Sequence, residues 1–223
     1  MPAEHAFAPY VRALGKGKLG SRSLSQDEAF DAMSMILQQQ VEPEQLGAFL
    51  MLLRVKEETP AELAGFVAAV RSFHNYSSAQ IPGIAVDIDW SSYAGKKRHL
   101  PWFLLSALTL AGQGIKVFMH GARGHTQGRI YSEDVLQQLG FPAAHDWDQV
   151  ESQLSNTNFS FMSLQHLSPP LDHIISLRAM FGLRSPVHTL TRLLNPLEAK
   201  HTIDGVFHPA YGPLHQHTAM LLK

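Results

Sequence analysis

Three signatures that begin α-helices lie near the start of the chain and constrain the fold more than any other feature. Ser25 to Glu28 and Thr59 to Glu62 each place a hydroxyl residue three positions before Glu, the capping-box pattern. Pro43 can open another helix, because proline is favoured in the first helical turn. Apolar residues at helical spacing follow each start. The residues before Asn75 are therefore expected to be wholly helical.

The apolar faces of these helices are large for so short a segment. Leu46, Phe49, Leu50 and Leu53 share one face of the helix that begins at Pro43. A second copy of the chain can cover such faces, which predicts a homodimer through the N-terminal helices. One side of an ordinary intrachain core explains them equally well, and the sequence leaves both explanations open.

After Ser78 short apolar runs alternate with helical segments. Buried strands are predicted at 84–88, 115–119 and 159–162, and helices at 101–110, 132–139, 148–154 and 171–180. The alternation predicts an α/β fold in which a helical N-terminal domain, residues 1–78, packs on a mostly parallel sheet flanked by helices, residues 79–223.

Composition excludes several classes of protein. With 45% apolar and 17% charged residues the chain is not disordered, and with no cysteine it has no disulfide or thiolate site. No apolar run reaches the ~20 residues that span a bilayer, and the N-terminus lacks a signal peptide, so we expect a cytoplasmic protein with no membrane partner. Because the net charge is −1, any attraction to nucleic acid must come from local clusters.

Two loops that follow consecutive predicted strands carry the residues of an anion site. The first runs from Asp89 to His99 and the second from His120 to Arg129, and both are rich in hydroxyls, glycines and cations. Ligands of open α/β sheets bind outside the carboxyl ends of the strands. A solvated turn explains any one of these residues equally well, so the prediction rests on the two loops together.

An ordered set of motifs resembles the anthranilate phosphoribosyltransferase family, which is glycosyltransferase family three. His120-Gly121-Ala122-Arg123 is similar to the family's His-Gly-Asn-Arg, and Asp134 to Gly140 to its Asp-Val-Leu-Glu-x-Leu-Gly. Arg178 to Arg184 and Leu193 to Pro196 are similar to the stretch that ends in Gly-Pro-Leu-x-Asn-Pro. The resemblance covers nearly the whole chain, and it implies a phosphoribosyltransferase or nucleoside phosphorylase-like fold and a homodimer.

The departures from the family concern its pyrophosphate site. Members that use phosphoribosyl pyrophosphate carry Gly-Thr-Gly-Gly-Asp after the first strand, where this chain has Trp90-Ser91-Ser92-Tyr93-Ala94. Side chains there obstruct the close approach of a diphosphate. The family's magnesium-binding acidic pair belongs to a segment beyond Lys223, which implies a chain that is either naturally short or truncated. We therefore expect no catalytic residue, no metal and no cofactor.

The resemblance is closest to a branch of paralogues that lack this loop and bind nucleic acid. The vestigial phosphate and substrate pocket would comprise Ser91, Ser92, Tyr93, Gly95, His120, Gly121, Arg123, Thr126 and Arg178. The basic groove that binds nucleic acid would comprise Lys16, Lys18, Arg22, Lys96, Lys97, Arg98, His99, Arg123 and Arg129. Flanking aromatics at Trp90, Tyr93 and Trp102 suit stacking on single-stranded bases. Alternatively, the tryptophans belong to the core and the lysine run is a solvated loop.

The sequence favours a non-catalytic protein that binds nucleic acid, preferably single-stranded DNA, with little sequence specificity. The alternative is a glycosyl or phosphoribosyl transferase in which Ser91, Ser92, Thr126 and Arg123 hold the phosphate, and which uses magnesium and phosphoribosyl pyrophosphate.

Three further questions concern the roles of individual histidines and aspartates. His120 could bind a ligand phosphate or satisfy a buried carbonyl group, and the sequence does not decide between them. Asp87 and Asp89 could act as a general-base pair or bind a metal, although a structural role suits Asp87 better. His215 and His217 are two residues apart on a predicted helix and do not share a face, so we expect structural or surface roles.

Overall fold

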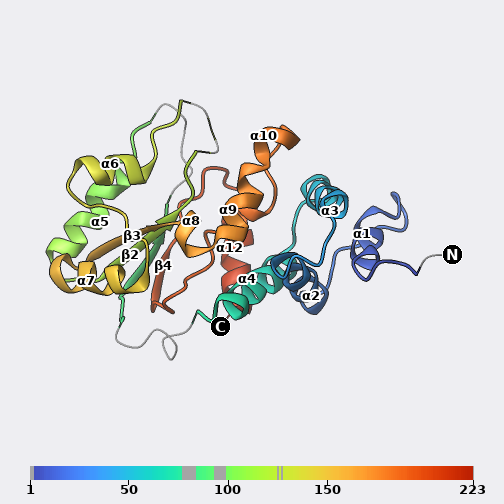
Figure 1. Ribbon diagram of the computed structural model, residues 1–223, viewed down its shortest axis with the longest axis horizontal. Coiled ribbons are helices and arrows are strands. Elements are labelled where there is room, and N and C mark those ends of the chain that lie inside the picture. Colours follow the sequence, from blue (N-terminus) through green and yellow to red (C-terminus); the bar gives the residue numbers. More distant parts are fainter. Residues whose placement is uncertain (1–2, 77–83, 93–98, 125, 127, 223) are drawn as a thin grey trace.

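The computed structural model describes residues 3–76, 84–92, 99–124, 126 and 128–222. Its N-terminal part is a group of helices, blue to cyan in Figure 1, beside a sheet with helices on its two faces. The N-terminal helices are α1 (Ala8–Gly15), α2 (Gln26–Leu37), α3 (Pro43–Lys56) and α4 (Pro60–His74). The predicted fold class is confirmed, and the domain boundary at residue 78 stays a prediction.

The N-terminal helices begin where their signatures predict. The Ser25 and Thr59 side chains accept from the amides of Glu28 and Glu62, and both capping boxes are complete. Pro43 opens α3, which has a further capping box formed by Glu42 and Gln45. Helix α1 was not predicted, because no side chain caps its start. Capping thus determines where three of these four helices begin.

Close packing of α2 on α4 depends on a glycine and a buried carboxylate. A Cβ atom at Gly65 would lie 2.2 Å from the carbonyl oxygen of Gln26, so only glycine lets the helices approach this closely. The fully buried Glu62 accepts the amide hydrogens of Leu24, at 2.9 Å, and Thr59, at 2.8 Å. These bonds join the loop before α2 to the start of α4.

The large apolar residues of α3 and α4 are covered within this chain. Leu50, Leu53, Leu63 and Phe66 are each at most 1% exposed, and they share one core with residues of the α/β part. A second copy is therefore not needed to bury these residues, and the homodimer stays a prediction.

The sheet is fully parallel, in the order β3-β2-β1-β4. Its strands are β1 (Ile88–Ser91), β2 (Val117–Gly121), β3 (Phe159–Ser163) and β4 (His201–Ile203). The prediction of a first strand at 84–88 was wrong: β1 begins at Ile88, the last residue of that run. The reason is that β1 buries polar residues, Asp89 and Ser91, which have hydrogen-bond partners and which an apolar pattern does not reveal. β4 was not predicted.

Helices cover both faces of this sheet (Figure 1). The helices of the α/β part are α5 (Phe103–Gly112), α6 (Ser132–Gln138), α7 (Trp147–Thr157), α8 (Leu164–Leu167), α9 (Pro169–Ser176), α10 (Arg178–Phe181), α11 (Val187–Leu190) and α12 (Tyr211–Leu221). The predicted helix at 171–180 is two helices, α9 and α10, separated at Leu177. α12 packs against α4, which ties the C-terminal part of the chain to the N-terminal helices. Among the helices of the described ranges, none is long and apolar enough to cross a bilayer.

Replacing Gly65 with alanine should separate α2 from α4. Overpacking of this kind lowers the free energy of unfolding by about 1–3 kcal/mol, and urea denaturation followed by circular dichroism measures it. Gly112→Ala is the matched control, because nothing lies within 4 Å of a Cβ at Gly112 in α5. Equal urea midpoints for Gly65→Ala and the wild type would contradict the packing described here.

Candidate functional site

A cavity of about 360 Å³, here called the first cavity, opens at the carboxyl ends of β1 and β2. Its walls come from the ends of these strands, the residues before α6, and the segment around α11. The parallel pairing of β1 with β2 places Ser91 beside His120, which brings the two loops singled out in the sequence to one edge of the sheet. The first cavity therefore lies where a parallel α/β sheet binds ligands.

The buried polar residues of these strands pair with each other. The imidazole Nε2 of His120 lies 3.2 Å from a carboxylate oxygen of Asp89, and both residues are 1% exposed. Asp87 accepts the amide hydrogen of Lys116 at 2.8 Å, and its structural role stays a prediction. Asp87 and Asp89 thus have separate partners, and neither is among the residues that line the first cavity.

The hydroxyls at the end of β1 are also bonded within the protein. Ser91 donates to Asp204 at 3.0 Å, and the Ser92 and Ser132 hydroxyls lie 2.7 Å apart. Ser132 begins α6 but does not cap it, because its hydroxyl meets Ser92 instead. A Cβ at Gly121 would lie 2.4 Å from that of Ser92, so the Ser92 side chain fills the space next to β2.

Arginines provide the charge of the first cavity. Arg129, Arg184 and Arg192 line it, and none of its described lining residues is acidic. Burial lowers the pKa of the Arg184 guanidinium, and the positive charges of Arg178, Arg129 and Arg192 lower that pKa further. Positive charge is therefore concentrated around Arg184, and a bound anion would stabilise its charged guanidinium.

The sequence analysis identified two of the four arginines gathered here, Arg129 and Arg178. It assigned Arg129 to the basic groove and Arg178 to the phosphate pocket, and it gave no role to Arg184 or Arg192. In the structure Arg178 donates to the Thr126 hydroxyl. A signal for Arg192 existed, because it occupies the proline position of the family's Gly-Pro-Leu-x-Asn-Pro stretch. Only the fold shows that the four arginines lie close together.

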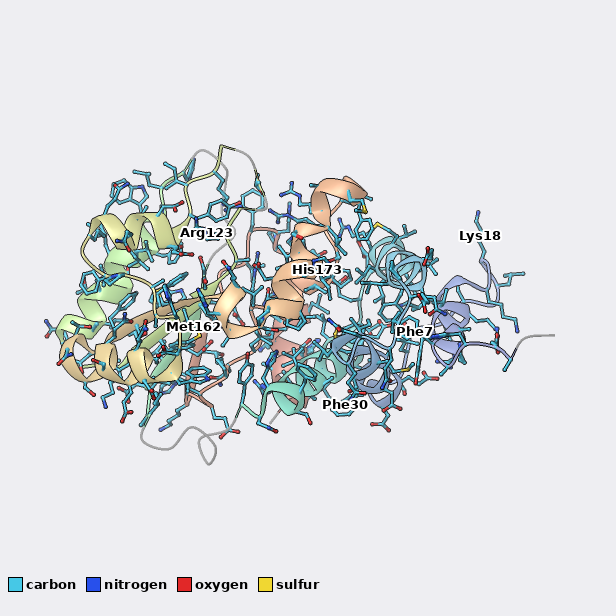
Figure 2. All side chains as sticks on the ribbon, viewed as in Figure 1. Phe7, Lys18, Phe30, Arg123, Met162 and His173 are labelled. Carbon is cyan, nitrogen blue, oxygen red and sulfur yellow. The ribbon has the colours of Figure 1, made fainter. Side chains whose placement is uncertain are left out.

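The structure does not bring the predicted groove residues into one place. Lys16, Lys18 and Arg22 lie between α1 and α2, and Figure 2 shows Lys18 and Arg123 toward opposite ends of the molecule. Two of the arginines have carboxylate partners. Arg22 donates to both oxygens of Glu28 at 2.6 Å and lowers the pKa of Glu28 to about 2, and Arg123 donates to Glu133 at 2.9 Å.

The other residues predicted to form the groove and the pocket lie partly along the first cavity and partly outside the described residues. His99, Arg129, Ser91, Ser92, His120 and Gly121 line the first cavity. Tyr93, Gly95, Lys96, Lys97 and Arg98 lie outside the described residues. Trp102 lines the cavity and is 66% exposed, whereas Trp90 is buried against Phe103 in the core between the sheet and α5. Of the aromatic residues expected to stack on bases, Trp102 alone is described at the surface.

The described residues do not fit a magnesium ion. No group of three or more histidines and carboxylates capable of holding a metal occurs among them, and the first cavity has no acidic lining residue in that part of the chain. His215 is buried 3.6 Å from Asp204, while His217 is exposed. This pair therefore has the structural and surface positions that the sequence indicated.

Gly121→Ala should lower stability by about 1–3 kcal/mol, because the new Cβ meets that of Ser92. Adding Ser92→Gly should restore part of the loss, which gives a coupling of roughly 0.5–3 kcal/mol. Urea denaturation of the wild type, both single variants and the double variant measures this coupling. Gly121→Ala combined with Ser91→Gly is the control pair. Strictly additive effects in the Ser92 pair would refute the contact.

Two family models match the chain. The helical bundle domain of a glycosyl transferase family matches residues 8–73, and the a/b domain of that family matches residues 103–223. An anthranilate phosphoribosyltransferase of Gluconobacter oxydans is 34% identical over 200 residues, 90% of this chain and 54% of its own length. The Escherichia coli protein YbiB is 28% identical over 92% of this chain and 64% of its own. The chain thus spans about half the length of its first curated relatives.

Solved structures share the fold. Anthranilate phosphoribosyltransferase from Thermus thermophilus superposes with a TM-score of 0.76 at 23% identity, covering 98% of this chain and 63% of that one. The Saccharomyces cerevisiae enzyme in complex with PRPP and Mg superposes with a TM-score of 0.78 at 20% identity, covering 99% and 63%. At these identities the likeness concerns the fold alone.

Proposed function

We propose that this chain, which belongs to the glycosyl transferase family that includes the anthranilate phosphoribosyltransferases, binds single-stranded nucleic acid over its first cavity. The observation that carries the proposal is the convergence of Arg129, Arg184 and Arg192 on a cavity with no acidic residue in its described lining. Arginines neutralise backbone phosphates without reading sequence, and they make affinity strongly dependent on salt.

An exposed aromatic face beside these charges supports a single strand over a duplex. Trp102 lines the same cavity as Arg129 and is 66% exposed, which leaves its indole open to a base. A base stacked on an aromatic side chain contributes about 1–3 kcal/mol, whichever base it is. Bases of a duplex are already stacked on one another, so this contribution favours unpaired strands.

The filled space at the end of β1 supports binding over transfer. A phosphoribosyl transferase must hold and neutralise a diphosphate, which needs close backbone approach or metal. Here the Ser92 side chain fills the space beside Gly121, and the Ser91 and Ser92 hydroxyls already bond to Asp204 and Ser132. Among the described residues, no group of three or more histidines and carboxylates is placed to hold a metal ion.

Transfer is the second candidate, and the names of the curated relatives favour it. Under it, Arg123 and Thr126 hold the phosphate of phosphoribosyl pyrophosphate. Arg178 donates to the Thr126 hydroxyl, so one cation already lies beside the residue that would hold the phosphate. Arg123 is ion-paired with Glu133 and would have to exchange that partner for the phosphate.

The lysines between α1 and α2 need a second protomer to act at this site. Lys18 lies toward the opposite end of the molecule from Arg123 (Figure 2). We infer that Lys16, Lys18 and Arg22 contribute to the same bound strand only in a homodimer. Single variants in this loop then lower the affinity for long oligonucleotides and leave the affinity for short ones unchanged.

Fluorescence anisotropy of a labelled oligothymidine at several salt concentrations tests the proposal. Trp102→Ala should weaken binding by roughly five-fold or more, the loss of one stacked base. Arg129→Ala should lower the slope of log affinity against log salt by about 0.7, one phosphate contact on a single strand. Arg12→Ala, on α1, is the matched control and should change neither.

Absence of binding at low salt, or equal losses in Arg129→Ala and Arg12→Ala, would exclude the first cavity as the nucleic-acid site. Pyrophosphate release by the wild type from phosphoribosyl pyrophosphate and magnesium would instead support the transferase candidate.

A further inference from the structure

An ion pair between Arg123 and Glu133 lies at the rim of the first cavity. It joins the loop after β2 to the first turn of α6. Arg123 follows Ala122 and Glu133 follows Ser132, and both Ala122 and Ser132 line the cavity. Neither member of the pair is itself among the described lining residues. The Arg123 guanidinium is therefore close to the proposed place of the strand, but it is bonded to a carboxylate.

This ion pair has only one hydrogen bond. Arg123 Nη1 donates to Glu133 Oε1 at 2.9 Å. The other carboxylate oxygen, Oε2, is buried and accepts no hydrogen bond among the described residues. Arg22, in contrast, donates to both oxygens of Glu28 at 2.6 Å. Because two parallel bonds between arginine and a carboxylate are the stronger arrangement, Arg123 can exchange its partner more readily than Arg22 can.

A second carboxylate, that of Asp172 in the first turn of α9, lies near the pair. Burial raises the pKa of the Asp172 carboxyl and the charge of Glu133 raises it further, whereas the charges of Arg123 and His173 lower it. Ile175, one turn further along α9, lines the first cavity, which places Asp172 at the same rim. Two carboxylates thus share the charge of Arg123, and both repel a phosphate that approaches it.

Arg123 nevertheless has what a phosphate contact requires. Its side chain is 53% exposed, so an anion in solvent can reach it. A guanidinium has five N–H donors, and Glu133 accepts one of them. What opposes a phosphate at Arg123 is therefore the neighbouring negative charge, and not a shortage of donors or of access.

We propose that Glu133 limits the affinity of the first cavity for single strands by holding Arg123 in this ion pair. While the pair is intact, Arg129, Arg184 and Arg192 neutralise the phosphates of the strand and Arg123 neutralises none. Removal of the Glu133 charge makes Arg123 a further phosphate contact. The inference rests on the strand binding proposed above, and it identifies the residue that regulates its strength.

Fluorescence anisotropy of the labelled oligothymidine measures the effect of Glu133→Gln, which keeps the size of the side chain and removes its charge. The slope of log affinity against log salt should become steeper by about 0.7, one phosphate contact on a single strand. Between 1 M and 0.1 M salt that slope amounts to roughly five-fold. Glu133→Gln should therefore bind about five-fold more tightly than the wild type at 0.1 M salt, and the gain should disappear toward 1 M.

A cycle of variants separates the release of Arg123 from a general loss of negative charge. Asp134→Asn is the matched control, because Asp134 is the next residue of α6, is exposed and has no bond to Arg123 among the described residues. It should leave the salt slope unchanged. In the Arg123→Ala background, Glu133→Gln should tighten binding by no more than Asp134→Asn does in the wild type.

The outcomes distinguish this proposal from the one on which it rests. Strand binding by the wild type, with equal gains from Glu133→Gln and Asp134→Asn, would overturn the role of Glu133 and leave the proposed function intact. An equal gain from Glu133→Gln with and without Arg123 would do the same. Absence of strand binding at low salt by both the wild type and Glu133→Gln would overturn both proposals.

Discussion

The parallel pairing of β1 with β2 is the constraint on which the first cavity depends. It places Ser91 beside His120 at the carboxyl edge of the sheet, and it buries Asp89 against the imidazole of His120. One carboxylate oxygen of Asp89 and the Ser91 hydroxyl are thus bonded within the protein, to His120 and Asp204. The arginines of the segment around α11 line the same cavity as Ser91 and Ser92, whose hydroxyls are already bonded within the protein.

Local signals were sufficient to predict α2, α3 and α4 but not the first strand. Ser25, Pro43 and Thr59 mark helix starts through short-range capping, which a sequence displays directly. The first strand is defined by Asp89 and Ser91, whose partners His120 and Asp204 are distant in sequence. Burial of a polar residue depends on such partners, so the apolar pattern placed the strand too early.

The candidate site was predictable in position but not in composition. The two loops after consecutive strands were expected to meet, and the first cavity lies there. The charges that converge on it come mostly from another segment, around Arg184 and Arg192, because the chain returns to the sheet edge after α10. Clusters of lysine and arginine along the sequence, such as Lys16 to Arg22, identified neighbours in the chain rather than neighbours in space.

The core that α3 and α4 share with α9 and α11 has a consequence for how the molecule folds. Leu53, Phe66, Leu171 and Leu190 belong to one apolar cluster, so no layer of solvent separates the N-terminal helices from the α/β part. A domain boundary after residue 78 separates the helical part of the sequence from the part in which strands and helices alternate. Residues on both sides of that boundary belong to this apolar cluster. Loss of structure in the N-terminal helices would expose apolar surface of the α/β part, so we expect the two parts to unfold together in spite of their different architectures.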